Sequence, residues 1–169
     1  MYTKLLTIDA HEPALVRNLA QAMATEQKIP NEIKELLTGD FAWDSVMGTW
    51  LVERKAASDL LSSLSGRGPE QFARLVASCD VPVLLIEGRI GDFGGLADSR
   101  SSKYQKDHHG RWSFEAMDHA LLTWQMAGMY VAHSPSTTAT PGAIVGLYKW
   151  SQKGTHSGGL RKKRLVLAG

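Results

Sequence analysis

Apolar and polar positions along the chain follow two different periods, which predict a mixture of strands and helices. Residues 4–9 form a short apolar run that ends in an acid, and residues 129–132 form another short strand pattern. Residues 81–87, Val-Pro-Val-Leu-Leu-Ile-Glu, form the strongest strand pattern of the chain. Their nearly continuous apolar character is typical of a strand that helices cover on both faces of a sheet.

Apolar residues at helical spacing predict helices over residues 12–27, 56–64, 70–79, 113–127 and 140–150. Pro13 suits the start of the first helix because its missing N–H is not needed there. Ser113 is the expected N-cap of the helix over 113–127. The Gly-Arg-Gly-Pro stretch at 66–69 separates the second helix from the third.

Two short apolar segments, 38–43 and 49–55, flank turn-forming residues at 44–48 and so predict a β-hairpin. Residues 89–111 are rich in glycine, serine and charged residues and are expected to form one long loop. From residue 151 onward the chain is Gly-rich and then basic. The order of these elements predicts an α/β domain.

Length and composition narrow the class of protein. The chain has 169 residues, 43% of them hydrophobic, which suits one domain with a sizeable core. Its 19 Lys and Arg against 17 Asp and Glu give a net charge of +2, which neither requires nor excludes a nucleic-acid partner. The single cysteine, Cys79, excludes an internal disulfide. Without a signal-like or membrane-length apolar run, the chain is expected to be soluble and intracellular, with no membrane partner.

The residues that indicate chemistry are Asp40, then Glu53-Arg54-Lys55, then Asp59. Glu53 and Lys55 lie two positions apart on a predicted strand, so their side chains leave the same face. The hairpin would bring Asp40, on its other arm, beside Glu53. Two close carboxylates repel each other unless a positive charge lies between them. A Mg²⁺ ion fits because it prefers oxygen ligands and keeps several waters.

Hydrolysis of a phosphodiester needs these groups. A metal ion neutralises charge on the phosphate and lowers the pKa of a water, and a lysine can orient that water and stabilise charge. The alternative is a solvated hairpin edge that carries surface charges. The apolar run at 50–52 and the apolar helix that follows favour the end of a core strand.

Gly39-Asp40 followed by residues 52–60, Val-Glu-Arg-Lys-Ala-Ala-Ser-Asp-Leu, resembles the GD…ERKxxxDL signature of XPF-type structure-specific endonucleases in the PD-(D/E)xK superfamily. The resemblance spans roughly residues 5–150. It implies a restriction-endonuclease-like core, in which a central mixed β-sheet is flanked by α-helices. The nuclease domain would occupy residues 1–152, followed by a basic, flexible tail over 153–169.

By position, the resemblance implies that Asp40 and Glu53 bind Mg²⁺, for which Mn²⁺ would substitute. Lys55 would serve the attacking water, and Arg54 would stand beside the scissile phosphate. Three further acids would complete the acidic cluster as additional metal ligands or their neighbours: Asp9, Glu12 and Asp59.

Members of this family cut branched DNA such as flaps, forks and junctions, so the resemblance implies a DNA endonuclease of that kind, with uses in DNA repair and recombination. His11 stands where the family usually carries an Arg, which is a departure in the first motif. The family's helix-hairpin-helix module has no counterpart in this sequence, so a homodimer or a helix-hairpin-helix partner protein is expected. There are two alternatives to an endonuclease that acts by itself. One is a non-catalytic DNA-binding or scaffold module of the same fold. The other is a nuclease subunit that is active only with a helix-hairpin-helix partner protein, which predicts exposed apolar residues on the last two helices.

Basic residues outside the signature predict contacts with DNA. Arg67 and Arg74 belong to the basic stretch after the signature, and Lys103 and Lys106 belong to the predicted loop. The loop also carries Tyr104, and basic residues interleaved with aromatics could hold a phosphate backbone and stack a base. The alternative for the loop is an ordinary solvated segment.

Overall fold

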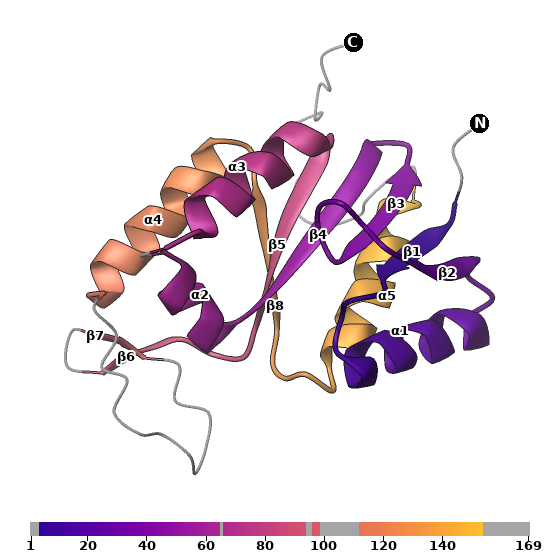
Figure 1. Cartoon of the computed structure of the whole chain (residues 1–169), viewed down its shortest axis with the longest axis horizontal. Coiled ribbons are helices and arrows are strands. Elements are labelled where there is room, and N and C mark those ends of the chain that lie inside the picture. Colours follow the sequence, from indigo (N-terminus) through magenta and orange to yellow (C-terminus); the bar gives the residue numbers. More distant parts are fainter. Residues whose placement is uncertain (1–3, 65, 94–95, 99–111, 154–169) are drawn as a thin grey trace.

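The computed structural model describes residues 4–64, 66–93, 96–98 and 112–153. A six-stranded sheet runs through the molecule (Figure 1). The β1–β3 and β3–β4 pairs are antiparallel and the other pairs are parallel, so the sheet is mixed, as the sequence predicted. In order across the sheet, the strands are β2 (Asn31–Lys34), β1 (Leu6–Asp9), β3 (Phe41–Ser45), β4 (Gly48–Ala56), β5 (Val81–Glu87) and β8 (Tyr130–Ser134).

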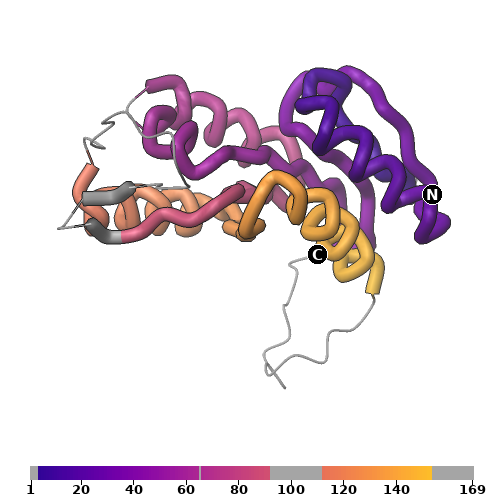
Figure 2. Tube along the Cα trace, turned by 90° about the horizontal axis from the view of Figure 1, so that it is seen from below, coloured from indigo at the N-terminus to yellow at the C-terminus, as the bar shows by residue number. Residues whose placement is uncertain are grey.

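Helices cover both faces of this sheet. Figures 1 and 2 show α1 and α5 side by side on one face, and Figure 1 shows the other three helices together on the opposite side. The predicted cap of α4 is confirmed, because the Ser113 side chain accepts a hydrogen bond from the backbone N–H of Ala116 at 3.0 Å. The described helices are α1 (Ala14–Glu26), α2 (Ala57–Leu64), α3 (Gly68–Ser78), α4 (Phe114–Met126) and α5 (Thr140–Ser151).

The sheet separates two apolar cores, and β5 contributes to both. Every residue of β5 is buried, which confirms the burial on both faces that its apolar run predicted. Val83 and Leu85 belong to the core beneath α1 and α5, whereas Leu84 and Ile86 belong to the core beneath α2, α3 and α4. The strand alternation therefore tells on which face each residue of β4 and β5 lies.

Three strands were not predicted. The strand β2 is polar and partly exposed, and it pairs with β1 in parallel at the edge of the sheet. Residues predicted as one long loop begin instead with a small antiparallel pair, β6 (Gly91–Phe93) and β7 (Leu96–Asp98). Each of these strands is three residues long, which is too short to show a period.

Several predictions fall outside the described residues. They are the solvated or DNA-binding character of residues 99–111, with Lys103 and Lys106, and the basic tail from 154 onward. Among the helices that the structure describes, none has the length and apolar character that a membrane crossing requires.

Candidate active site

The end of β4 carries the Glu-Arg-Lys part of the signature. Glu53 pairs in register with Leu84 of β5, and Lys55 pairs with Ile86. Glu53 and Lys55 therefore share the face of α2, α3 and α4, as their spacing predicted. The Nζ atom of Lys55 lies 3.0 Å from Oε1 of Glu53, and both side chains are largely shielded from solvent.

Asp40 reaches this end of β4 because the chain turns sharply just before β3. Gly39 has a φ of +77°, and a Cβ there would meet the backbone oxygen of Val52 at 3.2 Å. Glycine suits both the positive φ and the close approach. The backbone N–H of Asp40 donates to the Val52 oxygen at 2.7 Å, and the backbone N–H of Arg54 donates to Oδ2 of Asp40 at 2.6 Å. The hairpin thus places Asp40 against β4, beside Glu53.

The electrostatic setting of Asp40 suits a cation. Burial, and then the charges of Glu53 and Glu12, raise the pKa of Asp40 from 3.8 to about 8, although the hydrogen bond from the Arg54 backbone opposes this rise. A divalent ion beside two such carboxylates would relieve their repulsion. Mg²⁺ is often bound by one or two carboxylates and keeps several waters. Asp40 and Glu53 are therefore a donor set that fits Mg²⁺ or Mn²⁺.

Two other acids of the predicted cluster, Asp9 and Asp59, do not share the surroundings of Asp40 and Glu53. Oδ1 of Asp9 accepts a hydrogen bond from the backbone N–H of Leu36 at 2.9 Å and lies 3.5 Å from Nδ1 of His11. Asp59 is exposed in the first turn of α2. Within the described ranges, no group of three or more His, Cys, Asp or Glu side chains is arranged to hold a metal ion. The structure thus brings Asp40 and Glu53 together, and the metal roles of the other acids stay predictions.

Arg54 and Glu12 meet on the opposite face of the sheet. Nε of Arg54 lies 2.8 Å from Oε2 of Glu12, and Nη1 lies 3.2 Å from Oε1 of Glu87. Burial raises the pKa of Glu12, and the hydrogen bond and charge of Arg54 oppose that rise. The sequence pattern singled out no role for Glu87. The available signal was an acid at the end of an otherwise apolar strand.

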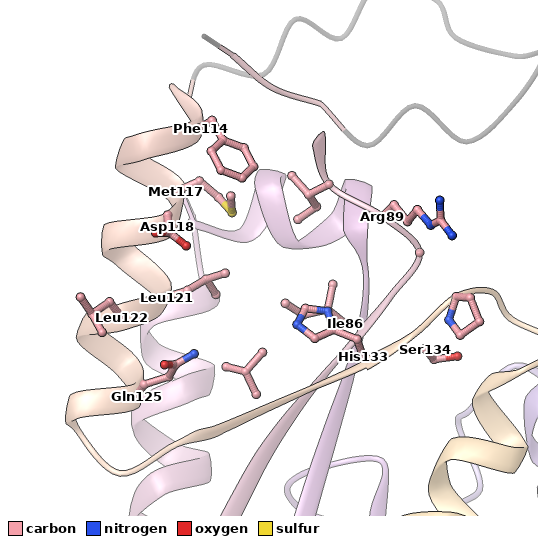
Figure 3. A pocket seen from close by; sticks show the side chains of 14 residues that line it. Ile86, Arg89, Phe114, Met117, Asp118, Leu121, Leu122, Gln125, His133 and Ser134 are labelled. Carbon is pink, nitrogen blue, oxygen red and sulfur yellow. The ribbon is translucent and has the colours of Figure 1, made fainter. Parts of the chain in front are cut away.

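A cavity of about 740 Å³ opens beside the candidate site. Ile86 lines it, and Ile86 pairs with Lys55 on one side and with His133 of β8 on the other. Figure 3 shows Phe114, Met117 and Leu121 of α4 on one side of this cavity, with His133 and Ile86 facing them. Apolar walls with a few polar groups are typical of sites for small organic groups.

The two arginines predicted to bind DNA also come together. Arg67 and Arg74 are exposed and line one polar depression of about 400 Å³, which Ser62 and Ser63 of α2 also line. They are separated by two turns of helix and so share one side of α3. The depression therefore carries two positive charges, and the carboxylate of Glu70 also lines it.

Comparisons with known proteins agree with this fold. The family model of the ERCC4 domain matches residues 8–144. The solved structure of XPF from Aeropyrum pernix is similar with a TM-score of 0.64 and 21% identity, over 87% of this chain and 64% of that chain. XPF from Aeropyrum pernix in complex with DNA is similar with a TM-score of 0.63 and 21% identity, over 88% of this chain and 64% of that chain.

The chain spans less than two thirds of the length of the two solved chains. At 21% identity the likeness to them concerns the fold, and it confirms the predicted mixed sheet flanked by helices. No curated protein is significantly similar to this chain in sequence.

Proposed function

Because the chain belongs to the ERCC4 domain family, we propose that it is a metal-dependent DNA endonuclease that hydrolyses phosphodiester bonds. The observation that carries this proposal is the meeting of Asp40, Glu53 and Lys55 at one end of the central sheet. The structural match to XPF in complex with DNA supports DNA as the substrate.

In the proposed hydrolysis, two carboxylates would bind the metal ion and a lysine would position the attacking water. Asp40 and Glu53 would hold Mg²⁺ or Mn²⁺. When bound, the ion would neutralise charge on the scissile phosphate and acidify a water molecule. Lys55 is held at 3.0 Å by Glu53 and would orient the attacking water and stabilise negative charge as it develops. In-line attack on phosphorus would leave a 5′-phosphate and a 3′-hydroxyl.

The proposed substrates are branched DNAs, in which duplex meets single strand. The XPF-type endonucleases that the signature resembles cut such DNA. The cavity that begins one strand away from Lys55 supports this choice, because its apolar walls and the His133 ring offer room for an unpaired base near the scissile bond.

Cleavage of end-labelled DNA tests the proposed function. Single-stranded, duplex, flap, fork and four-way-junction DNA would be offered with Mg²⁺, with Mn²⁺ or with EDTA. We expect cutting near the branch that depends on the metal. Salt-sensitive binding without any cutting would contradict the endonuclease and favour a non-catalytic DNA-binding module of the same fold.

We expect Arg67 and Arg74 to contact phosphates of the DNA. Replacing either residue by Gln should weaken binding to all DNA sequences alike and reduce the slope of log K against log salt by about 1, since each arginine would release about one counterion. Fluorescence anisotropy over a salt series measures this slope. Gln71→Ala, in the same depression, removes no charge and is the control. An unchanged slope in both arginine variants would refute the phosphate contacts.

We infer that a second copy of the chain covers the apolar surface formed by α4, β8 and α5. Leu122 and Met126 of α4 are exposed, as are Tyr130 of β8 and Trp150 of α5. In the part of the chain that the structure describes, β8 lies at the edge of the sheet and pairs only with β5. Exposed apolar side chains on elements that flank an edge strand are typical of a protein interface. A second chain would satisfy both features at once.

The oligomeric state tests this inference. We expect a dimer by analytical ultracentrifugation, and Met126→Lys should raise its dissociation constant at least about tenfold by placing a charge in the interface. Leu15→Lys, on the exposed side of α1, is the control because Leu15 is also exposed but lies away from this surface. A wild-type protein that stays monomeric would point instead to a different partner, such as a helix-hairpin-helix protein.

A further inference from the structure

The side chain of Arg54 is fully engaged by carboxylates of the protein. Nε donates to Oε2 of Glu12 at 2.8 Å, Nη2 donates to Oε1 of Glu12 at 3.3 Å, and Nη1 donates to Oε1 of Glu87 at 3.2 Å. Only 13% of the Arg54 side chain is exposed. Each guanidinium nitrogen therefore has a protein acceptor, on the face of the sheet opposite to Glu53 and Lys55.

Glu87 is itself held by the start of α5. The Thr137 hydroxyl donates to Oε1 of Glu87 at 2.7 Å, and the Thr140 hydroxyl donates to Oε2 at 2.6 Å. Thr140 is completely buried, and 7% of the Glu87 side chain is exposed. Both carboxylate oxygens are thus occupied, and the group has a fixed direction toward Arg54. A carboxylate this well bonded is a rigid anchor rather than a mobile surface acid.

Arg54 also reaches the candidate metal site through its main chain. Its backbone N–H donates to Oδ2 of Asp40 at 2.6 Å, although its side chain lies on the other face of β4. Its neighbours in the strand, Glu53 and Lys55, project toward the site itself. One residue therefore connects the buried ion pairs on the α1 and α5 face with the acids on the opposite face.

We propose that Glu87 is a positioning residue for the metal-binding carboxylates. It anchors the Arg54 side chain, and the anchored Arg54 backbone directs Asp40 and Glu53. Arg54 then supports cutting without contacting DNA, in contrast to the place beside the scissile phosphate that the family resemblance implies. This inference rests on the proposed function. Groups that orient metal ligands typically contribute about 10- to 100-fold in metal affinity or activity.

The first test is Glu87→Gln, which keeps the shape of the side chain but removes its charge. We expect the affinity for Mn²⁺, measured by electron paramagnetic resonance without DNA, to fall at least about tenfold. Cutting at low Mn²⁺ should fall with it and recover as Mn²⁺ is raised, while KM for DNA stays unchanged. Glu26→Gln, at the exposed end of α1, is the matched control.

Two variants of Thr140 keep the inference testable if Glu87→Gln fails to fold. Thr140→Val removes the hydroxyl that donates to Glu87 and should weaken Mn²⁺ binding in the same direction. Thr140→Ser keeps that hydroxyl and should restore wild-type affinity. Thermal melting identifies which variants are folded, and only folded variants enter the comparison.

The outcomes separate this inference from the proposed function. A folded Glu87→Gln protein with unchanged Mn²⁺ affinity would overturn the positioning role. The role would also be overturned if Glu87→Gln raised KM for DNA and left the Mn²⁺ affinity unchanged. Because Glu87 acts through Arg54, the double variant Glu87→Gln, Arg54→Gln should bind Mn²⁺ as weakly as Arg54→Gln alone. A wild-type protein that binds Mn²⁺ but cuts no DNA would refute the endonuclease, and the affinity comparison would still decide the role of Glu87.

Discussion

Replacing Lys55 by Met is expected to lower the rate of DNA cutting by about 10²- to 10⁴-fold, the usual contribution of a group that assists proton transfer. The Lys55 ammonium lies beside Glu53 and faces the candidate metal site, so Met keeps the length of the side chain but removes its charge and its protons. Asp40→Asn should lower the rate at least as much, because it removes the charge of one of the two metal-binding carboxylates. Single-turnover cleavage of a labelled flap with saturating Mg²⁺ measures both rates.

The control for this prediction is Lys4→Met. Lys4 is exposed just before β1, at the opposite end of that strand from Asp9, so its loss removes the same charge without touching the site. Lys4→Met should cut as fast as the wild type. Full activity in the double variant Asp40→Asn, Glu53→Gln, with its fold intact, would contradict the proposed function.

The metal-free protein is expected to become more stable when Asp40 is replaced by Asn, and the gain should increase with pH. The pKa of Asp40 is about 8 in the folded state and 3.8 ordinarily, so between these values the folded chain holds a proton that the unfolded chain has released. The unfolded state then binds fewer protons, and the free energy of unfolding falls by about 1.4 kcal/mol per pH unit. This stability is fully present below pH 3.8 and is lost as the pH rises through about 8.

Urea unfolding in EDTA at several pH values measures this effect. Asparagine cannot ionise, but its side-chain oxygen can still accept the hydrogen bond from the Arg54 backbone N–H. Near pH 8 the free energy of unfolding of Asp40→Asn should therefore exceed that of the wild type by on the order of a few kcal/mol, whereas near pH 4 the two should differ little. Asp59→Asn, on the exposed surface of α2, should stay within about 0.5 kcal/mol of the wild type at every pH. Mg²⁺ should stabilise the wild type more than Asp40→Asn, since it binds the folded state. An Asp40→Asn protein that follows the wild type at all pH values would contradict the raised pKa.

Much of the candidate site could be predicted because it depends on local rules. Glu53 and Lys55 share a face because strands alternate, and Asp40 joins them because a short turn connects two adjacent antiparallel strands. The burial of β5 on both faces followed from its unbroken apolar run. Each of these properties depends on residues that are close in the sequence.

The strands that were missed lack such a local signal. The residues of β2 are mostly polar, and this strand exists because β1 has an open edge whose backbone groups need hydrogen-bond partners. Its position in the sheet depends on the fold around it rather than on its own composition. The same holds for β6 and β7, which pair with each other across a short connection.

By itself, the sequence determined the alternation of helices and strands, the two-sided burial of β5 and the face on which Glu53 and Lys55 lie. Only the tertiary structure decided what surrounds Arg54. Its partner Glu12 lies 42 positions away in the chain, and its partner Glu87 lies 33 positions away. These ion pairs depend on the parallel register of β4 with β5 and on the packing of α1 and α5 against one face of the sheet. Periodicity in the chain reports the face of a side chain, whereas the identity of its partner depends on which distant segments fold against that face.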